Sequence, residues 1–359
     1  MARIRTQLAD GLRAVTISSD GPFRMRDGTG GLHELAAGAY RFGADFNFQL
    51  AEGEQPTALT GPLRFLPGTA LLRFQRPYRG VLDVASTGKR LSVVNDVGLD
   101  AYVRGVVSRE MPRDWPLEAV KAQAVAARSY ALAQRRAGAF DVYADTRDQV
   151  YGGVAAETPV GNAATDGTRR QALFFDGKVA TTFFFSTSGG QTASVGDVFS
   201  GARQIPYLRS VPDPYDSLSP YHTWGPVAIG AARASKLLGV AGVTDLRPIP
   251  ATGRAREVVV VGRNGEFAFA APVIRRALEL RSTWFRVGVL SLTASGRTLT
   301  GSVSRLKSAT LERRVAGGVW EAGPPLELRP DGTFELAVEP GGYRLAAGDA
   351  RGAPVSVAP

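Results

Sequence analysis

The chain of 359 residues contains no cysteine and only two histidines, His33 and His222. Without cysteine it cannot form disulfides, zinc–thiolate sites, iron–sulfur clusters or a thiol nucleophile. Two histidines are too few for a histidine-rich metal cage. We therefore expect neither a metal site nor a bound cofactor.

Long apolar runs are also missing. No stretch of about 18 apolar residues occurs, so the sequence predicts no membrane span. Residues 1–21, MARIRTQLADGLRAVTISSDG, have basic side chains with no apolar block behind them, unlike a secretory leader. The lack of cysteine fits an exported protein better than a cytosolic one. Either the chain is intracellular or a leader has been removed from it, and of these two we expect an exported protein whose leader is not in this chain.

The composition is that of a globular protein. Hydrophobic residues make up 44% of the chain, and the length predicts roughly two or three domains. Lysine and arginine number 43 against 33 acidic residues, a net charge of +10, which favours a polyanionic partner such as nucleic acid, an anionic cell wall or acidic lipid. Nucleic acid is the poorest of these, because the basic residues are scattered and no nucleic-acid module is present.

Residues 4–97 predict strands, because short alternating apolar segments are separated by turn residues. A helix follows over residues 100–111, with Asp100 as its N-cap and Pro112 as its stop. A second, alanine-rich helix starts near Pro116 and ends near Gly138, with Arg135 and Arg136 in its last turn. Small side chains on this helix allow close packing.

The remaining sequence predicts mixed elements and then strands alone. Asp176-Gly177 separates two strongly β-forming runs, which indicates a hairpin. VAIGAARASKLLGV predicts a helix, and residues 287–359 predict a small immunoglobulin- or transthyretin-like sandwich. The fold class is therefore α+β: a strand-rich, catalytic-type domain with a central alanine-rich helix, and a C-terminal β-sandwich. We predict domains at residues 1–74, 75–286 and 287–359.

Glu110 is the first candidate for catalysis because it lies in the last turn of a predicted helix. The partial negative charge at a helix C-terminus opposes an ionised carboxylate, and partial burial acts in the same direction. Both effects favour the protonated carboxyl that a general acid needs. A solvated glutamate at a helix end is the alternative, and position alone does not exclude it.

The segment DAYVRGVVSREMPRDWPLEAVKAQAVAARSYALAQ resembles the signature of the stage II sporulation protein D and amidase-enhancer family of peptidoglycan-acting proteins. The likeness continues through DQVYGG and NAATDGTRRQALFFDGKVATTFFFSTSGGQT to SPYHTW, and covers roughly residues 75–285. Family members commonly show a GHGVGMSQYGA-like motif near the domain end. This chain has RRALELRSTWFRVGVLSLTASG instead.

The resemblance implies a lytic transglycosylase. Glu110 stands where the family has its proposed catalytic glutamate, in the EMP motif. Its substrate would be the β-1,4 bond between N-acetylmuramic acid and N-acetylglucosamine in glycan strands without peptide stems. One carboxyl would protonate the leaving oxygen and then deprotonate the muramoyl 6-hydroxyl, giving a 1,6-anhydro sugar, unlike the paired carboxylates of hydrolases. We expect a secreted or wall-associated protein.

Other residues in these motifs are candidates for substrate binding. They are Arg128, Lys121, Asp148, Gln149, Tyr151, Ser186, Ser188, His222 and Trp224. Cations could bind the lactyl carboxylate, amide and aromatic side chains suit sugars, and Asp148 could help electrostatically. Each also has a structural alternative: a helix-surface charge, a Gly-Gly or serine turn, or an aromatic anchor for a loop.

A second function class stays open. The protein could be a peptidoglycan-binding accessory protein that lacks turnover, or an enhancer of a separate cell-wall amidase. The missing C-terminal motif favours this class, whereas the intact segments REMPRDWP and AVAARSYA favour the enzyme.

Overall fold

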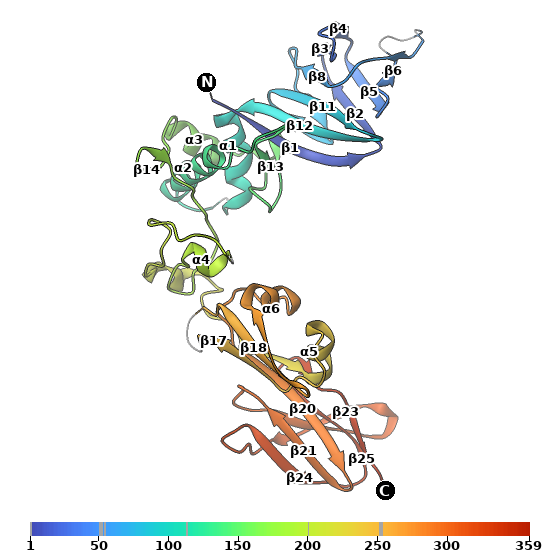
Figure 1. Ribbon diagram of the computed structural model, residues 1–359, viewed down its shortest axis with the longest axis vertical. Coiled ribbons are helices and arrows are strands. Elements are labelled where there is room, and N and C mark those ends of the chain that lie inside the picture. The colour runs from blue at the N-terminus through green and yellow to red at the C-terminus, as the bar shows by residue number, and fades with distance from the viewer. Residues whose placement is uncertain (1, 50–52, 54, 113, 200, 251–253) are drawn as a thin grey trace. The chain divides into compact units, whose positions relative to one another are not determined.

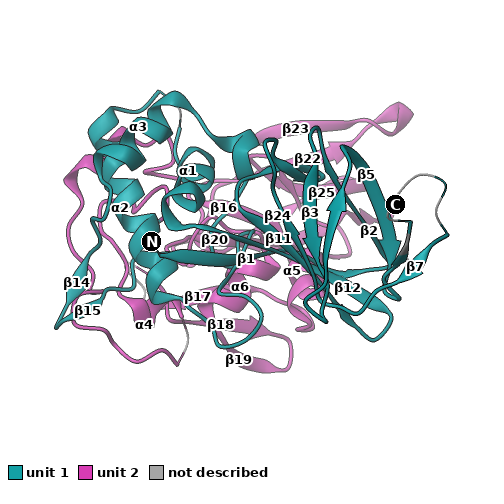
Figure 2. Ribbon diagram, turned by 90° about the horizontal axis from the view of Figure 1, so that it is seen from above, with its two compact units in different colours: residues 1–184 teal, residues 185–359 magenta. Residues whose placement is uncertain are grey.

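The computed structural model describes residues 2–49, 53, 55–112, 114–199, 201–250 and 254–359. The chain divides into two compact units, unit 1 (Met1–Phe184) and unit 2 (Phe185–Pro359), which Figure 2 colours separately. Their boundary falls inside the predicted 75–286 domain, and the three-domain division stays a prediction. In the described part of the chain, no helix has the length and apolar character needed to cross a membrane.

The described residues of unit 1 form strands and helices. The strands are β1 (Arg3–Leu12), β2 (Ala14–Ser19), β3 (Phe23–Arg26), β4 (Leu32–Leu35), β5 (Gly38–Gly43), β6 (Asn47–Phe48), β7 (Thr57–Ala58), β8 (Leu63–Leu66), β9 (Leu72–Phe74), β10 (Arg76–Tyr78), β11 (Val81–Thr87), β12 (Arg90–Gly98), β13 (Val142–Tyr143), β14 (Phe174–Phe175) and β15 (Lys178–Val179). The helices are α1 (Leu99–Glu110), α2 (Leu117–Ala133), α3 (Pro159–Gly167) and the 3₁₀ turn η1 (Gly153–Ala156).

A seven-stranded sheet, in the order β13-β1-β12-β11-β8-β3-β4, and a four-stranded sheet, β10-β9-β2-β5, share one core with the helices. Along β12, the side chains of Leu91, Val93 and Val97 alternate into this core, as the two-residue period of a strand requires. Figure 1 shows α1, α2 and α3 together at one end of the β1 and β12 strands.

The helices of unit 1 pack through residues spaced three and four apart. In α1 the buried residues include Tyr102, Val103, Val106 and Val107. In α2 Ala124, Ala127 and Ala131 are fully buried, so the neighbouring backbones can approach closely. The alanine-rich helix is therefore a scaffold at the centre of unit 1.

Unit 2 contains more strand than helix. They are β16 (Val227–Gly230), β17 (Asp245–Ile249), β18 (Glu257–Gly262), β19 (Gly265–Ala270), β20 (Val287–Ser295), β21 (Thr298–Val303), β22 (Thr310–Arg314), β23 (Trp320–Pro325), β24 (Thr333–Ala337), β25 (Gly341–Ala347), β26 (Ala350–Arg351) and β27 (Val355–Val357). Its helices are α4 (Val195–Val198), α5 (Ala231–Leu238) and α6 (Ala271–Ala277), with 3₁₀ turns η2 (Pro214–Leu218) and η3 (Ala316–Gly318).

Strand β20 belongs to two cores of unit 2. It pairs in parallel with β16 and antiparallel with β21. Val289 packs with α5, α6, β17 and β18, whereas Leu290 packs into the core formed with β21, β24 and β25. Because successive side chains of a strand point to opposite faces, one strand serves both cores.

The predicted α+β class with a strand-rich C-terminal region is confirmed. Some local predictions were wrong. Gly98, not Asp100, is the N-cap of α1, and α2 ends at Ala133, so Arg135, Arg136 and Gly138 lie beyond it. Residues 227–230 form β16, not a helical turn, because they complete a sheet with β20. The aromatic run at 181–185 is not a strand, and the hairpin strands β14 and β15 have two residues each.

Candidate functional site

Glu110 is the last residue of α1 and is half-buried. The backbone turns extended at Met111 (φ −125°, ψ 142°), directly before Pro112, so the helix cannot continue. The Val150 backbone N–H donates a hydrogen bond of 2.8 Å to Glu110 Oε1. Among the described residues, Oε2 has no hydrogen-bond or ion-pair partner. The carboxyl is thus held through one of its two oxygens.

Val150 lies in the DQVYGG loop (residues 148–153), and Asp148 anchors the start of this loop. The Asp148 carboxylate, 1% exposed, forms a bidentate ion pair with Arg136 at 2.7 and 2.9 Å. It also accepts hydrogen bonds from the Tyr130 hydroxyl (2.9 Å) and the Tyr143 backbone N–H (2.7 Å). All these partners belong to unit 1, so Asp148 holds the loop in place.

Gln149 and Tyr151 anchor the same loop against α1 and β12. The Tyr102 hydroxyl donates to Gln149 Oε1 at 3.1 Å, and the Tyr151 hydroxyl donates to Asn95 Oδ1 at 2.8 Å. The rings of Tyr102 and Tyr151 lie 5.0 Å apart. Burial raises the pKa of both tyrosines, so they remain neutral donors. Gln149 Nε2 is buried without a partner among the described residues.

Gly105 explains how closely the loop approaches α1. A Cβ at this position would lie 2.5 Å from the Tyr151 ring, and the Gly105 carbonyl accepts the Gly152 N–H at 3.0 Å. Only glycine leaves room for this contact. The α1 helix therefore positions Glu110 directly through its end and indirectly through the loop.

Arg128 and Lys121 differ sharply in their surroundings. The Arg128 side chain is 2% exposed, pairs with Asp100 at 3.2 Å, and donates to the carbonyl oxygens of Gln171 (3.1 Å) and Thr165 (3.3 Å). Lys121 lies near the surface of α2 and pairs with Glu118 at 2.6 Å. The guanidinium of Arg128 is therefore used inside unit 1, where it joins α1, α2 and α3.

The four other predicted residues, Ser186, Ser188, His222 and Trp224, line one cavity of about 840 Å³ in unit 2. His222 Nδ1 lies 2.6 Å from Asp216 Oδ2. Asp216 also accepts the backbone N–H groups of Ser188 (2.6 Å) and Gly189 (2.9 Å). Burial opposes the charge of Asp216, but the hydrogen bonds from His222 and the two N–H groups hold its pKa below the usual range.

Sequence reasoning missed Asp216 and the basic wall of this cavity. Asp216 precedes His222 by six residues in the loop that ends at SPYHTW, so an acid close before the histidine was the available signal. Arg254, Arg281 and Arg286 also line the cavity, but no local pattern marks them. Across the described residues, no group of three or more His, Asp or Glu side chains could hold a metal ion.

Comparison with known proteins identifies the class. A family profile described as Stage II sporulation protein matches residues 87–175. The chain is 31% identical over 229 residues to stage II sporulation protein D of Bacillus amyloliquefaciens, covering 56% of this chain and 65% of that protein. It is 36% identical over 114 residues to the amidase enhancer of Bacillus subtilis, covering 32% and 15%. A Brachyspira hyodysenteriae protein described as uncharacterized is 41% identical over 138 residues, 37% of each chain.

Residues 87–175 therefore match the stage II sporulation protein family, and the resemblance seen in the motifs to stage II sporulation protein D and the amidase enhancer is confirmed. The matched segment contains α1, α2, α3 and the DQVYGG loop. The alignments span less than two thirds of each of these relatives.

Proposed function

We propose that the protein acts at the bacterial cell wall as a peptidoglycan lytic transglycosylase with Glu110 as its general acid and base. The observation that carries the proposal is the asymmetric environment of the Glu110 carboxyl: Oε1 is held by the Val150 N–H, while Oε2 has no partner among the described residues. The family membership and the net charge of +10 support an anionic glycan as substrate.

The Val150 N–H favours one oxygen of Glu110 as the carrier of the proton. The N–H donates to Oε1, and the carbonyl oxygen of a neutral carboxyl is a better acceptor than its hydroxyl oxygen, so the contact favours the hydrogen on Oε2. Oε2–H then protonates the glycosidic oxygen as the bond from C1 of the muramoyl residue breaks. The resulting carboxylate removes the proton of the muramoyl 6-hydroxyl, whose oxygen bonds to C1. The products are a 1,6-anhydro end and a free N-acetylglucosamine 4-hydroxyl, and Glu110 is again protonated.

A secreted or wall-associated location follows from this proposal, because the substrate lies outside the cytoplasm. The positive charge would add long-range attraction to the anionic wall, weakened by salt. Asp148, Gln149 and Tyr151 act in this proposal by positioning the loop that holds Glu110, and Arg128 by joining the three helices.

The second candidate is a wall-binding accessory protein that enhances a separate amidase. The match to a relative described as an amidase enhancer favours it, as does the absence of the GHGVGMSQYGA-like motif. This alternative needs the fold and a glycan-binding surface but no proton transfer by Glu110.

Stem-free glycan strands test the two candidates. Wild-type protein, Glu110→Gln and Glu118→Gln are incubated with the strands, and 1,6-anhydromuramoyl ends are measured by mass spectrometry. The Glu110→Gln change keeps an oxygen acceptor for the Val150 N–H but leaves the side chain with no acidic proton to give. Glu118 is a matched control, because its side chain is 81% exposed and bonded only to Lys121 among the described residues.

Anhydro ends from wild type and the control, but not from Glu110→Gln, support the enzyme. Strand binding without product from any of the three supports the accessory protein. Equal cleavage by all three would show that Glu110 is not the acid.

A further inference from the structure

The cavity of about 840 Å³ in unit 2 has a strongly basic wall. We call it the arginine cavity: its wall includes Arg254, Arg281, Arg286 and His222, and none of the described residues that line it is Asp or Glu. The buried Asp216 contacts the cavity indirectly, through the histidine ring. The lining therefore presents guanidinium groups without a compensating carboxylate.

Two of these arginines are exposed residues that have no acidic partner in the described part of the chain. Arg281 and Arg286 are exposed, and neither forms an ion pair with any acid in the described part of the chain. The Arg281 guanidinium lies 4.4 Å from the centre of the Tyr221 ring, which holds it by a cation–π contact. Arg254 is more buried; it donates to the Ser188 carbonyl at 2.6 Å, and its Nε is buried with no partner among the described residues.

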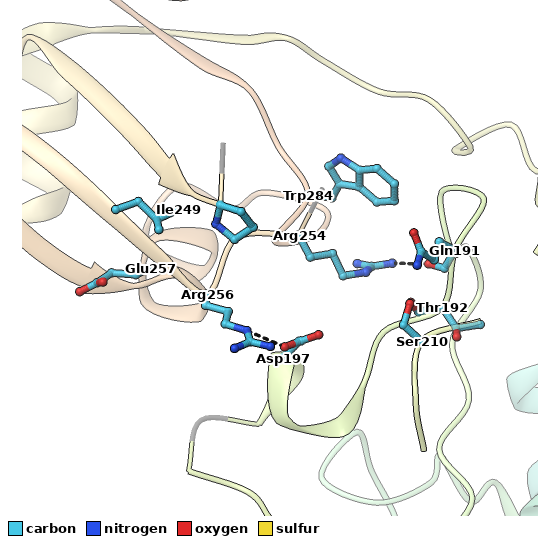
Figure 3. Close-up of a pocket in the computed structure, with 10 residues that line it drawn as sticks. Gln191, Thr192, Asp197, Ser210, Ile249, Arg254, Arg256, Glu257 and Trp284 are labelled. Atoms are coloured by element: carbon cyan, nitrogen blue, oxygen red, sulfur yellow. Dashed lines mark hydrogen bonds and ion pairs between the residues drawn. The ribbon is translucent and has the colours of Figure 1, made fainter. Parts of the chain in front are cut away.

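The neighbouring cavity, of about 910 Å³, provides a contrast (Figure 3). It shares Arg254 and Trp284 with the arginine cavity, but Asp197 and Glu257 also line it. Its Arg256 is paired with Asp197 at 2.8 Å, as the dashed line in Figure 3 marks. Net positive charge without paired acids is thus a property of the arginine cavity and not of this whole surface.

The remaining lining suits a sugar. Tyr221 and Trp284 are 50% and 37% exposed. Arg281 and Arg254 lie against one face of each ring, at 4.4 and 5.8 Å from the ring centres, so a pyranose ring would contact the remaining exposed ring surface. Ser186 and Thr187 add hydroxyl groups that can hydrogen-bond to sugar hydroxyls. The volume falls within the range of small-ligand sites, about 300–1,000 Å³.

We propose that the arginine cavity binds a carboxylate-bearing sugar, with Arg281 and Arg286 as the carboxylate ligands. The identity of the sugar rests on the proposed function: it is N-acetylmuramic acid, whose lactyl carboxyl is free in stem-free glycan. In a strand that carries peptide stems the same carboxyl is an amide and has no charge. The cavity therefore selects stem-free glycan by charge, because a guanidinium forms a much stronger hydrogen bond to a carboxylate than to an amide.

The test compares two ligands that differ only in this charge. The disaccharide N-acetylglucosaminyl-N-acetylmuramic acid and its lactyl amide are titrated into the full chain, with tryptophan fluorescence and calorimetry as readouts. We expect the acid to bind about tenfold more tightly than the amide, the gain of one charge-assisted contact. In the double variant Arg281→Gln/Arg286→Gln this preference should fall to about twofold or less. Both side chains are exposed, so the variant should keep its fold.

Arg256→Gln is the matched control, because Arg256 lies in the neighbouring cavity and is already paired. It should keep the preference for the acid. Equal affinities for acid and amide in wild type, no binding of either, or a preference that survives in the double variant would overturn the proposal. Strand cleavage is measured in parallel. Cleavage without charge preference would refute this inference alone, whereas charge preference without cleavage would refute the transglycosylase alone.

Discussion

The DQVYGG loop of unit 1 and the arginine cavity of unit 2 use similar side chains in opposite ways. In unit 1, Arg136 and Tyr130 bind the buried Asp148, and Arg128 binds carbonyl oxygens. In unit 2, Arg281 and Arg286 are exposed and have no acidic partner among the described residues. The residue type alone therefore does not tell whether an arginine stabilises the fold or is free to contact a ligand. Its burial and its ion-pair partners distinguish the two cases. Changes in the first region should alter folding, and changes in the second should alter ligand affinity.

The largest effect is expected for Arg128→Met. The change leaves Asp100 without its 3.2 Å partner and removes the donors to the Gln171 and Thr165 carbonyls. The Asp100 side chain is 20% exposed and keeps Arg169 at 3.7 Å, so the loss comes mainly from the buried carbonyl oxygens that lose their donors, and should be about 3 kcal/mol. Urea unfolding, with hydrogen exchange of the α2 amides, measures the loss. Arg286→Met in the exposed cavity wall should change stability by less than about 0.5 kcal/mol; equal losses would contradict the comparison.

Gly105→Ala tests the close contact between α1 and the loop. The added Cβ would lie 2.5 Å from the Tyr151 ring, so the ring or the helix must shift at a cost of about 1–3 kcal/mol. Because Val150 adjoins Tyr151, the contact with Glu110 should weaken and strand cleavage should fall. Gly98→Ala is the control, since its Cβ meets no atom within 4 Å. If both variants unfold at the same urea concentration, steric contact is not the reason for glycine at residue 105.

Asp83 gives unit 1 a pH dependence. Burial raises its pKa from 3.8 to about 6, against the opposing charge of Arg64. The folded state therefore holds this proton more tightly than the unfolded state, and the stabilisation present below about pH 4 is lost as the pH rises through about 6. Allowing for solvent screening, the loss should be about 1–2 kcal/mol.

Asp83→Asn removes this titration. The urea concentration at the unfolding midpoint is measured at about pH 4 and at about pH 7. Its decrease from the lower to the higher pH should be smaller for the variant than for wild type. Parallel pH profiles would show that Asp83 does not titrate in this window.

Lys121→Gln should have the smallest effect. Lys121 pairs with the exposed Glu118 on the same helix, and such surface pairs contribute about 0.5 kcal/mol or less. Thermal unfolding and the KM for glycan strands should both be nearly unchanged. A clear rise in KM without a change in stability would instead favour the substrate-binding role that the sequence suggests.

Local signals in the sequence predicted several elements. Pro112 ends α1 so that Glu110 is its last residue, and Asp176-Gly177 lies at the turn between β14 and β15. Local signals did not predict the role of a side chain where contacts between distant parts of the chain determine that role. Arg136 resembles a helix-terminal cation in sequence, but it binds Asp148 beyond the end of α2.

The candidate site shows the same limit. Glu110 and the DQVYGG loop stand in two separate motifs that resemble the same family, so each could be selected as a candidate from the sequence. The contact between the Val150 N–H and Glu110 joins residues 40 positions apart and was not predicted. The arginine cavity combines residues from 186 to 286, and no periodicity or spacing connects side chains so far apart. Whether an arginine such as Arg128 is buried also depends on the packing of α1, α2 and α3, which its neighbours in sequence do not reveal.

Strand β20 connects the wall of the arginine cavity directly to the C-terminal sheets. Arg286 immediately precedes this strand, and its carbonyl accepts the Val227 N–H at 2.9 Å, next to the parallel pairing of β16 with β20. A protein shortened at residue 286 would lose this strand and expose the face of the core that Val289 now covers. Tension applied to the C-terminal sheets would likewise reach Arg286 along the backbone of β20, because Arg286 immediately precedes this strand.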